Sequence, residues 1–370
     1  MAPIVNNQSE NEFNEFIFTL ENTNVSVANA IRRTLLSDIP LLVFKTFPYE
    51  KNRVEFIANT TRFNNEIIKQ RLSAIPVYIK DVENFPFEEY EFSIDKVNNT
   101  SNIDYVTTGD FVIKDTKNNK ILDKSETINI FPKNPLTNYF IDIVRLRPKL
   151  SENMKGEELK IKGKLHIGTA KEDSNYNAVS TAAYSYTPDP IKINEIWETE
   201  IYPSIKNDLS KDEIDKYKSN WLLLEAKRYY KENSFDFKIK SSCVFNNKEL
   251  IIISCDLLIK QLGQYIELIN EQKIKIINSD NTLNNCFDVI LENTGYTIGK
   301  LIEYFMYSKF YEDNELLSFC GFKKEHPHYS DSILRIAFKE ETLKELIYTY
   351  LKDCCILSIE EIKQIQNQFR

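Results

Sequence analysis

A glycine-rich segment and a lysine stand where a phosphate-binding loop could lie. The segment is Gly295-Tyr296-Thr297-Ile298-Gly299-Lys300. A phosphate loop needs four residues between its glycines and a Ser or Thr after the lysine to reach magnesium. This chain has three residues between the two glycines, and Leu301 follows the lysine. The segment is therefore interpreted as the start of a helix, and no nucleotide or other cofactor is predicted.

Soft metal ligands form a second group of candidates, namely Cys320, His326 and His328. Thiolate and imidazole groups at this spacing could hold a structural metal ion. Pro327 and the alternating apolar flanks suit the edge of a strand better. No metal site is predicted, although a use for these three side chains stays open.

Reactive thiols and acid-base catalysis have few candidates. Cys354 and Cys355 lie in a pattern typical of a helix, and only Lys352 is near enough to lower a thiol pKa. The chain has three histidines in 370 residues, and its acidic residues are scattered. General acid-base catalysis usually depends on such groups. We therefore predict no catalytic residues.

Composition indicates a globular protein that does not bind DNA by itself. Net charge is −8, so the average surface field repels phosphate backbones and a large partner must supply any nucleic-acid contact. No apolar run approaches the roughly 18 residues of a membrane span, and the first residues lack the pattern of a signal peptide. The six cysteines all follow residue 242, which is no disulfide framework. An intracellular protein without membrane contact is expected.

One segment of twelve residues nearly repeats. Leu20–Ile31 reappears 271 residues later as Leu291–Ile302, with five identical positions. Both copies follow an apolar strand-like run, and Ser26 and Thr297 stand where a helix needs its N-cap. Two related halves would most simply bury their apolar helix faces against each other, as a pseudo-two-fold dimer in one polypeptide. Coincidence in an Asn- and Ile-rich chain is the alternative.

The remaining elements support a repeat. Each half begins with strand, cap and helix, and each ends in a long amphipathic helix, so the two levels of pattern agree. Periodicity predicts helices over 26–37, 64–73, 211–232, 248–270 and 340–369, a mostly β region over 77–167, and strands over 318–322 and 333–338.

A longer match identifies a family. Asn29–Pro40 resembles the hallmark helix of the alpha-like assembly subunits of multisubunit RNA polymerases: bacterial alpha, archaeal D and the third-largest subunit of eukaryotic polymerase II. Gln70–Val77 is similar to a second family motif, Arg-Leu-x-x-Ile-Pro. The family's later strands are resembled, in order, by Val144–Pro148, Leu159–Lys162, Gly168–Glu172 and Val179–Tyr184. The resemblance covers about the first 270 residues.

The second half resembles the small partner of that subunit, called L in archaea and the eleventh subunit in polymerase II. Tyr296–Leu301 is similar to its His-Thr-Leu-Gly-Asn-Leu helix start, and Phe319–Phe322 with His326-Pro327 is similar to its central hairpin. The chain therefore looks like that heterodimer fused into one polypeptide. Such fusions, with this composition, are reminiscent of large nucleocytoplasmic DNA viruses, especially mimivirus-like ones. A viral source would imply a location in virions and in viral factories of the host cytoplasm.

The sequence also departs from the family. Many relatives carry a zinc-binding cysteine group or an iron-sulfur cluster in the inserted domain, but this chain has no cysteine there. The insert must then be held by core packing. Asp173 replaces the usual His and Ala178 the usual Pro, which leaves the loop before Val179 in doubt.

The resemblance implies an α+β fold with two alpha-subunit-like dimerisation domains packed as an intramolecular pseudo-dimer, and a β-rich domain inserted in the first. The D-like domain would comprise 1–46 and 171–270, the insert 47–170, and the L-like domain 271–370. The family pairing places an intramolecular seam between the hallmark helices. Its predicted residues are Val27, Ile31, Leu35, Ile298, Leu301, Ile302 and Phe305.

The implied function is a non-catalytic assembly platform of a DNA-directed RNA polymerase. Its partners would be the largest and second-largest subunits, which carry the catalytic chemistry, and small polymerase subunits, with DNA reached only through the complex. The docking surface for the large subunits would include Asn29, Arg32, Arg33, Ser180 and Thr181. A stand-alone α+β enzyme or a DNA-binding factor on a similar scaffold is the alternative, because fold resemblance alone does not fix function.

Overall fold

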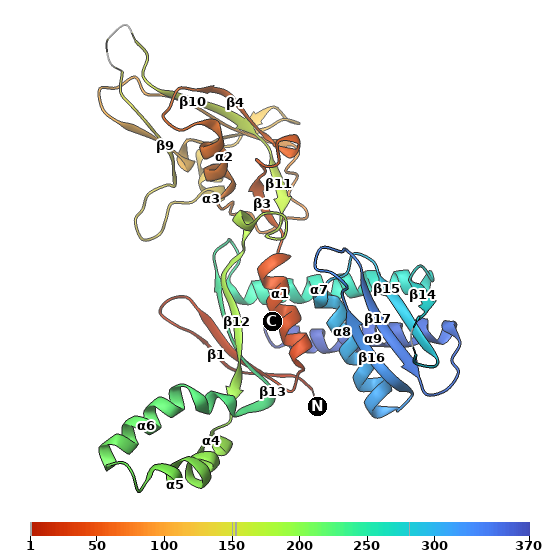
Figure 1. Cartoon of the computed structure of the whole chain (residues 1–370). Coiled ribbons are helices and arrows are strands. Elements are labelled where there is room, and N and C mark those ends of the chain that lie inside the picture. The colour runs from red at the N-terminus through yellow and green to blue at the C-terminus, as the bar shows by residue number, and fades with distance from the viewer. Residues whose placement is uncertain (1, 150, 152–153, 281) are drawn as a thin grey trace. The chain divides into compact units, whose positions relative to one another are not determined.

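The computed structural model describes residues 2–149, 151, 154–280 and 282–370 (Figure 1). It confirms a mixed α+β architecture. The chain divides into two compact units, which are described one at a time. The first unit comprises Met1–Leu35, Thr181–Lys240 and Asn247–Arg370, and the second comprises Leu36–Ser180 and Ser241–Asn246. The predicted boundaries of the insert, 47 and 170, stay a prediction.

Sheet 1 of the first unit has the strand order β1-β2-β13-β12. Its strand β2 pairs antiparallel with β1 on one side and β13 on the other, and it buries Phe16, Phe18 and Leu20. The strand bounds are β1 (Ile4–Glu10), β2 (Phe16–Glu21), β12 (Val179–Pro188) and β13 (Tyr230–Ser241), and helices α1 (Val25–Ser37) and α7 (Asn247–Asn270) follow β2 and β13.

Sheet 2, also in the first unit, repeats this plan with the order β14-β15-β17-β16. In each sheet the second strand leads into a helix, and the third strand in spatial order leads into a long helix. The bounds are β14 (Lys275–Asn278), β15 (Cys286–Leu291), β16 (Leu317–Lys323), β17 (Ser332–Phe338), α8 (Tyr296–Met306), the π-helical η6 (Tyr307–Asp313) and α9 (Lys344–Asn367). The repeat of twelve residues thus belongs to a repeat of six elements.

The helix starts differ from the prediction. Helices α1 and α8 begin at Val25 and Tyr296, so the proposed caps Ser26 and Thr297 already lie inside the first turn. Asn24 precedes α1, and the backbone N–H of Ser26 donates to its Oδ1 at 2.8 Å. Gly295 is the N-cap of α8. Asn and Gly are both accepted at this position, which explains why the Ser/Thr pattern misled.

A helical segment between β12 and β13 also differs from the prediction. The expected helix over 211–232 ends nine residues early, because Leu224 adopts φ −115° and ψ −80°, outside the helical region, and β13 begins at Tyr230. Trp197 and Trp221 form the small core of this segment, with ring centroids 5.4 Å apart. Its elements are α4 (Pro190–Ile196), η4 (Trp197–Ile201), α5 (Tyr202–Ile205), α6 (Lys211–Leu223) and η5 (Glu225–Arg228).

The second unit is mostly β, as predicted. Sheet 3 has the order β4-β10-β5-β7-β8, and two-stranded pairs join β3 to β11 and β6 to β9. The strands are β3 (Leu41–Phe44), β4 (Val54–Asn59), β5 (Tyr90–Val97), β6 (Asp104–Thr107), β7 (Val112–Asp115), β8 (Lys120–Ile121), β9 (Asp142–Leu146), β10 (Glu158–Gly163) and β11 (Leu165–Gly168), with helices η1 (Tyr49–Lys51), α2 (Asn65–Ser73), η2 (Thr108–Asp110), α3 (Lys124–Ile130) and η3 (Ser174–Tyr176).

Aromatic rings fill the core of this second unit. Phe44, Phe92, Phe111 and Phe131 contact one another with ring centroids 4.6 to 6.5 Å apart. Stacked and edge-on ring pairs stabilise a core beyond the area that they bury. Helix α3, which the sequence did not predict, supplies a capping box at Asp123 and ends beside Phe131. Among the described residues, no helix is long and apolar enough to cross a membrane.

Candidate subunit interface

Helix α1 carries the predicted docking residues on its polar side. Asn29 and Arg32 lie one turn apart and are both half-buried. The Nε and Nη2 atoms of Arg32 donate to Asn29 Oδ1 at 3.0 and 2.8 Å. This pairing fixes the guanidinium plane in advance, which lowers the entropy lost when it binds a carbonyl or carboxylate. Arg33, the next residue, is exposed.

The other two predicted docking residues lie at the start of β12. Ser180 is exposed and is the last residue of its segment of the second unit, whereas Thr181 is half-buried and belongs to the first unit with Asn29, Arg32 and Arg33. Further along β12, burial raises the pKa of Tyr184, and the nearby positive charge of Arg32 opposes this in part. The assignment of these five residues to a docking surface stays a prediction.

The seven predicted seam residues are all buried in the first unit. Val27, Ile31 and Leu35 of α1 are at most 1% exposed, and the residues of α8 are at most 8% exposed. Helix α8 packs mainly on α9, β16 and β17, which belong to its own half. Burial is therefore established for Ile298, Leu301, Ile302 and Phe305 as well, while their place between the halves stays a prediction.

The most extensive helix contact in the first unit joins α7 to α9, that is, the long helices that follow sheet 1 and sheet 2. At this contact, Gln366 Nε2 of α9 donates to Asp256 Oδ1 at 2.6 Å and to the backbone oxygen of Ile252 at 3.1 Å. Leu258 and Leu262 of α7 are fully buried. The contact between the two halves is thus apolar, with additional hydrogen bonds from Gln366 to α7.

Two equivalent threonines of the repeat connect each half to the long helix of the other. Thr23, after β2, hydrogen-bonds the carboxylate of Glu361 on α9. Thr294, after β15, hydrogen-bonds the hydroxyl of Tyr265 on α7. Burial raises the pKa of Glu361, which the Thr23 bond partly offsets, and raises the pKa of Tyr265 to about 12. Reciprocal contacts of this kind are typical of two-fold interfaces, where patch i meets j and j meets i.

The last residues of the chain add a third connection. The backbone N–H of Val5 in β1 donates to Gln368 Oε1 at 2.7 Å, and Gln368 Nε2 donates to the backbone oxygen of Pro3 at 2.9 Å. The Phe369 ring lies edge-on to Phe18 with centroids 5.0 Å apart. Sequence reasoning missed these contacts, although an aromatic residue after a long amphipathic helix was an available signal.

The structure separates the candidate metal ligands. Cys320 is half-buried on β16, with Sγ 3.9 Å from the backbone oxygen of Glu303, and burial raises its pKa to about 12. His326 and His328 are exposed in the following loop, with ring centroids 4.9 Å apart. Among the described residues, no three His, Cys, Asp or Glu side chains are grouped so that they could hold a metal ion.

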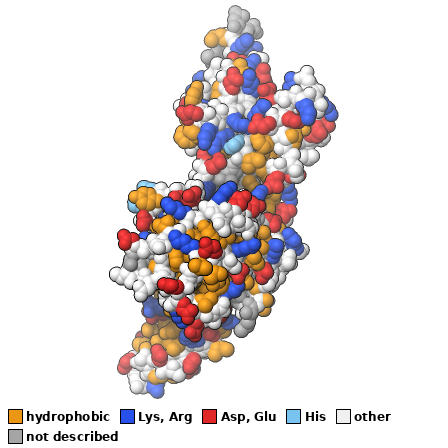
Figure 2. Space-filling model, turned by 90° about the vertical axis from the view of Figure 1, so that its right-hand side faces the viewer, with side chains coloured by type: hydrophobic (Ala, Val, Ile, Leu, Met, Phe, Trp, Pro, Cys, Tyr) orange, Lys and Arg blue, Asp and Glu red, His pale blue; other side chains and the backbone are white. Residues whose placement is uncertain are grey.

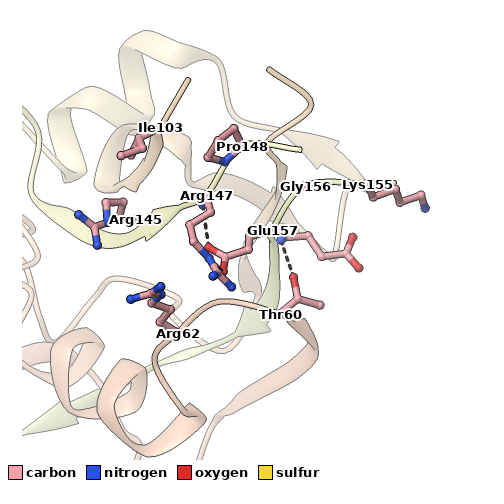
Figure 3. Close-up of a pocket in the computed structure, with 10 residues that line it drawn as sticks. Thr60, Arg62, Ile103, Arg145, Arg147, Pro148, Lys155, Gly156 and Glu157 are labelled. Atoms are coloured by element: carbon pink, nitrogen blue, oxygen red, sulfur yellow. Dashed lines mark hydrogen bonds and ion pairs between the residues drawn. The ribbon is translucent and has the colours of Figure 1, made fainter. Parts of the chain in front are cut away.

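The second unit contains a basic pocket that the sequence analysis did not single out. It has a volume of about 630 Å³ and lies between the ends of β4, β9 and β10. In Figure 3 the guanidinium groups of Arg62, Arg145 and Arg147 lie around one opening, whereas Lys155 extends away from it. Alternation along β9 places Arg145 and Arg147 on the same face of the chain, and this spacing could have revealed the pair.

Comparison with known proteins assigns the chain to a family. The model of the RNA polymerase Rpb3/Rpb11 dimerisation domain matches residues 17–262, about two thirds of the chain. The chain therefore belongs to this family. The match begins in β2 and ends in α7, so it includes α1 and the whole second unit.

Several curated relatives are similar. The chain is 28% identical to subunit 3B of DNA-directed RNA polymerases IV and V from Arabidopsis thaliana, over 49% of this chain and 56% of that protein. It is 25% identical to the polymerase II subunit rpb3 of Dictyostelium discoideum, over 46% of this chain and 54% of that protein. Subunit Rpo3 of Methanosphaera stadtmanae is 21% identical over 70% of this chain and 95% of that protein. The chain thus spans a little over half the length of the first two relatives.

Proposed function

We propose that this protein is a non-catalytic assembly subunit of a DNA-directed RNA polymerase. The observation that carries the proposal is the family match over residues 17–262, which includes the hallmark helix α1. All three relatives named above are subunits of DNA-directed RNA polymerases. In this role the chain holds the largest and second-largest subunits, and it reaches DNA only through them.

We further propose that the chain combines both partners of the family's heterodimer. Three observations support this: the equal strand order of sheets 1 and 2, the contact of α7 with α9, and the reciprocal bonds of Thr23 and Thr294. Linking two partners in one chain raises the effective concentration of each for the other, so the pair does not dissociate on dilution. The hallmark helices and the long helices would then pack about one pseudo-two-fold axis.

The large-subunit docking surface is proposed to include Asn29, Arg32 and Arg33 of α1, with Ser180 and Thr181 nearby. The Asn29–Arg32 pair supports this because it presents a fixed guanidinium on a half-buried surface. Arginine is enriched in the energetic centres of interfaces, where its planar fork binds carboxylates and carbonyls. A viral source, and with it a location in virions or viral factories, stays a prediction.

Pull-down of the second-largest polymerase subunit from the same source tests the function. The parent protein, Arg33→Ala and the control Arg228→Ala are compared at equal concentration, since Arg228 is also exposed in the first unit. Truncating an interface arginine typically costs about 2 kcal/mol or more, so Arg33→Ala should recover far less subunit while Arg228→Ala recovers as much as the parent.

Two results would contradict the proposal at different levels. Equal recovery by Arg33→Ala and the parent would remove Arg33 from the docking surface. No recovery by the parent itself, together with tight DNA binding or turnover of a substrate by the isolated chain, would replace the polymerase function by the alternative of a stand-alone enzyme or DNA-binding factor.

A further inference from the structure

The basic pocket of the second unit is built on rigid backbone. The backbone N–H of Glu158 donates to Thr60 Oγ1 at 2.8 Å, and the Thr60 N–H donates to the Glu158 backbone oxygen at 3.1 Å, which joins the ends of β4 and β10. Gly156 lies so close to this framework that an added Cβ would stand 1.8 Å from the backbone oxygen of Asn98. Only glycine fits there, so the wall of the pocket is closely packed.

One arginine of the pocket is locked in place by a buried carboxylate. Glu157, whose side chain is 8% exposed, accepts the Nε–H of Arg147 on one oxygen and the backbone N–H of Arg147 on the other. Within the described part of the chain, no acceptor binds the two terminal nitrogens of Arg147. They are therefore available to a ligand. Arg147 is therefore oriented before any ligand arrives.

The other two arginines carry charge that the described residues do not balance. Neither Arg62, in the turn after β4, nor Arg145, near the end of β9, has a carboxylate within ion-pair distance among the described residues, and both are exposed. Like charges that converge without a counter-ion repel one another, so an anion between them would be stabilised. Ile103, which is 52% exposed, and Pro148 add apolar surface beside the cations.

We propose that this pocket binds an acidic peptide segment of a partner protein, in which carboxylates alternate with apolar side chains. Guanidinium forks match carboxylates in bidentate geometry, and the apolar surface of Ile103 and Pro148 accommodates the side chains between them. This inference is independent of the polymerase function, because it depends only on the geometry and charge of the second unit.

A nucleic acid fits the same site less well. Binding to a nucleic-acid backbone needs a basic track that follows several phosphates, whereas here the basic cluster is confined to one pocket. Elsewhere the charges are mixed: on the face seen in Figure 2, Lys and Arg are interspersed with Asp and Glu, with apolar patches between them. The chain as a whole carries a net charge of −8.

The test is a binding titration of the full chain with a short fluorescein-labelled peptide in which Asp and Glu alternate with Leu, followed by fluorescence anisotropy. A peptide with Asn and Gln in place of the acids is the matched probe, and a labelled oligouridylate is the nucleic-acid probe. Arg62→Ala and Arg145→Ala are the variants, because both side chains are exposed and their loss should leave the fold intact. Arg228→Ala is the control for charge outside the pocket. Arg147→Ala is avoided, since it would remove the cation that pairs with the buried carboxylate of Glu157.

The parent should bind the acidic peptide and not the amide peptide, more weakly as salt is raised. Each pocket variant should bind it roughly tenfold more weakly, as expected for loss of a charge-assisted hydrogen bond, with an unchanged melting temperature. Arg228→Ala should bind like the parent. The proposal is overturned if the acidic peptide does not bind, if it binds all three variants equally, or if the oligouridylate binds more tightly and alone loses affinity in Arg62→Ala and Arg145→Ala.

Discussion

Substituting Phe369 tests whether the second half depends on sheet 1 of the first half. The Phe369 ring is 5% exposed and lies edge-on to Phe18 and Phe16, with centroids 5.0 and 6.3 Å away. Truncating a buried Phe to Ala typically costs about 3 to 5 kcal/mol, which includes the cavity left behind, and each aromatic pair adds about 0.5 to 1.5 kcal/mol beyond its buried area. A value near 3 kcal/mol is expected because Phe369 lies in the turn after α9, which can relax more than a central strand.

This loss of unfolding free energy can be measured as a fall in the melting temperature of the first unit. For a cooperative unit of about two hundred residues, each kcal/mol shifts the midpoint by roughly 2 to 4 °C, so Phe369→Ala should melt about 10 °C below the parent in differential scanning calorimetry. Phe13→Ala is the matched control, because Phe13 is 64% exposed in the turn between β1 and β2 and should change little. If Phe369→Ala melts like Phe13→Ala, the end of the chain is not anchored on sheet 1 and the described connection between the halves is wrong.

Two further predictions concern the contacts between the two halves. Cutting the chain within 271–274, between α7 and β14, and co-expressing the pieces should give a stable 1:1 complex by size-exclusion chromatography. Fragments that purify apart would contradict the pairing of the two halves within one chain. A cut within 279–285 is unsuitable because it separates β14 from its partner strand β15. Because burial raises the pKa of Glu361, the folded state retains a proton that the unfolded state releases, so stability should fall as pH rises above the usual value of 4.5. Glu361→Gln keeps an acceptor for Thr23 but cannot lose a proton. The difference between its urea midpoint and that of the parent should therefore grow as pH rises. If the two urea midpoints change in parallel with pH, Glu361 does not titrate in this range.

Much of the first unit could be predicted from the sequence because its elements are strongly periodic. Helices α7 and α9 and strands β16 and β17 lie within a few residues of their predicted bounds. Periodicity failed where a single residue decides the outcome. Leu224 ends helix α6 by its backbone angles, and Asn24, not a Ser or Thr, precedes α1. Propensity at one position is weak beside the packing that selects it.

The contacts between the halves could not be predicted, because they join residues hundreds of positions apart. The Thr23–Glu361 and Thr294–Tyr265 bonds need the relative placement of β2, β15, α7 and α9, which no local pattern encodes. The repeat did mark Thr23 and Thr294 as equivalent, but it could not distinguish a capping role from a bond to a distant helix. The basic pocket was hidden for the same reason, since Arg62 and Arg145 come from separate strand ends.

The two sheets differ in the length of the segments that connect their elements. Sheet 2 connects its helix α8 to β16 by 307–316 and β16 to β17 by 324–331, whereas sheet 1 has 38–178 and 189–229 at the same two places. Helices α7 and α9, whose contact joins the halves, lie outside both insertions. The insertions therefore add surfaces that this contact does not use. Each has one: the arginine pocket lies in the first, and the exposed leucines 222–224 lie in the second. The first insertion begins directly after α1 and ends directly before β12, the two elements that carry the proposed docking residues, whereas sheet 2 makes the same connection with 307–316 alone.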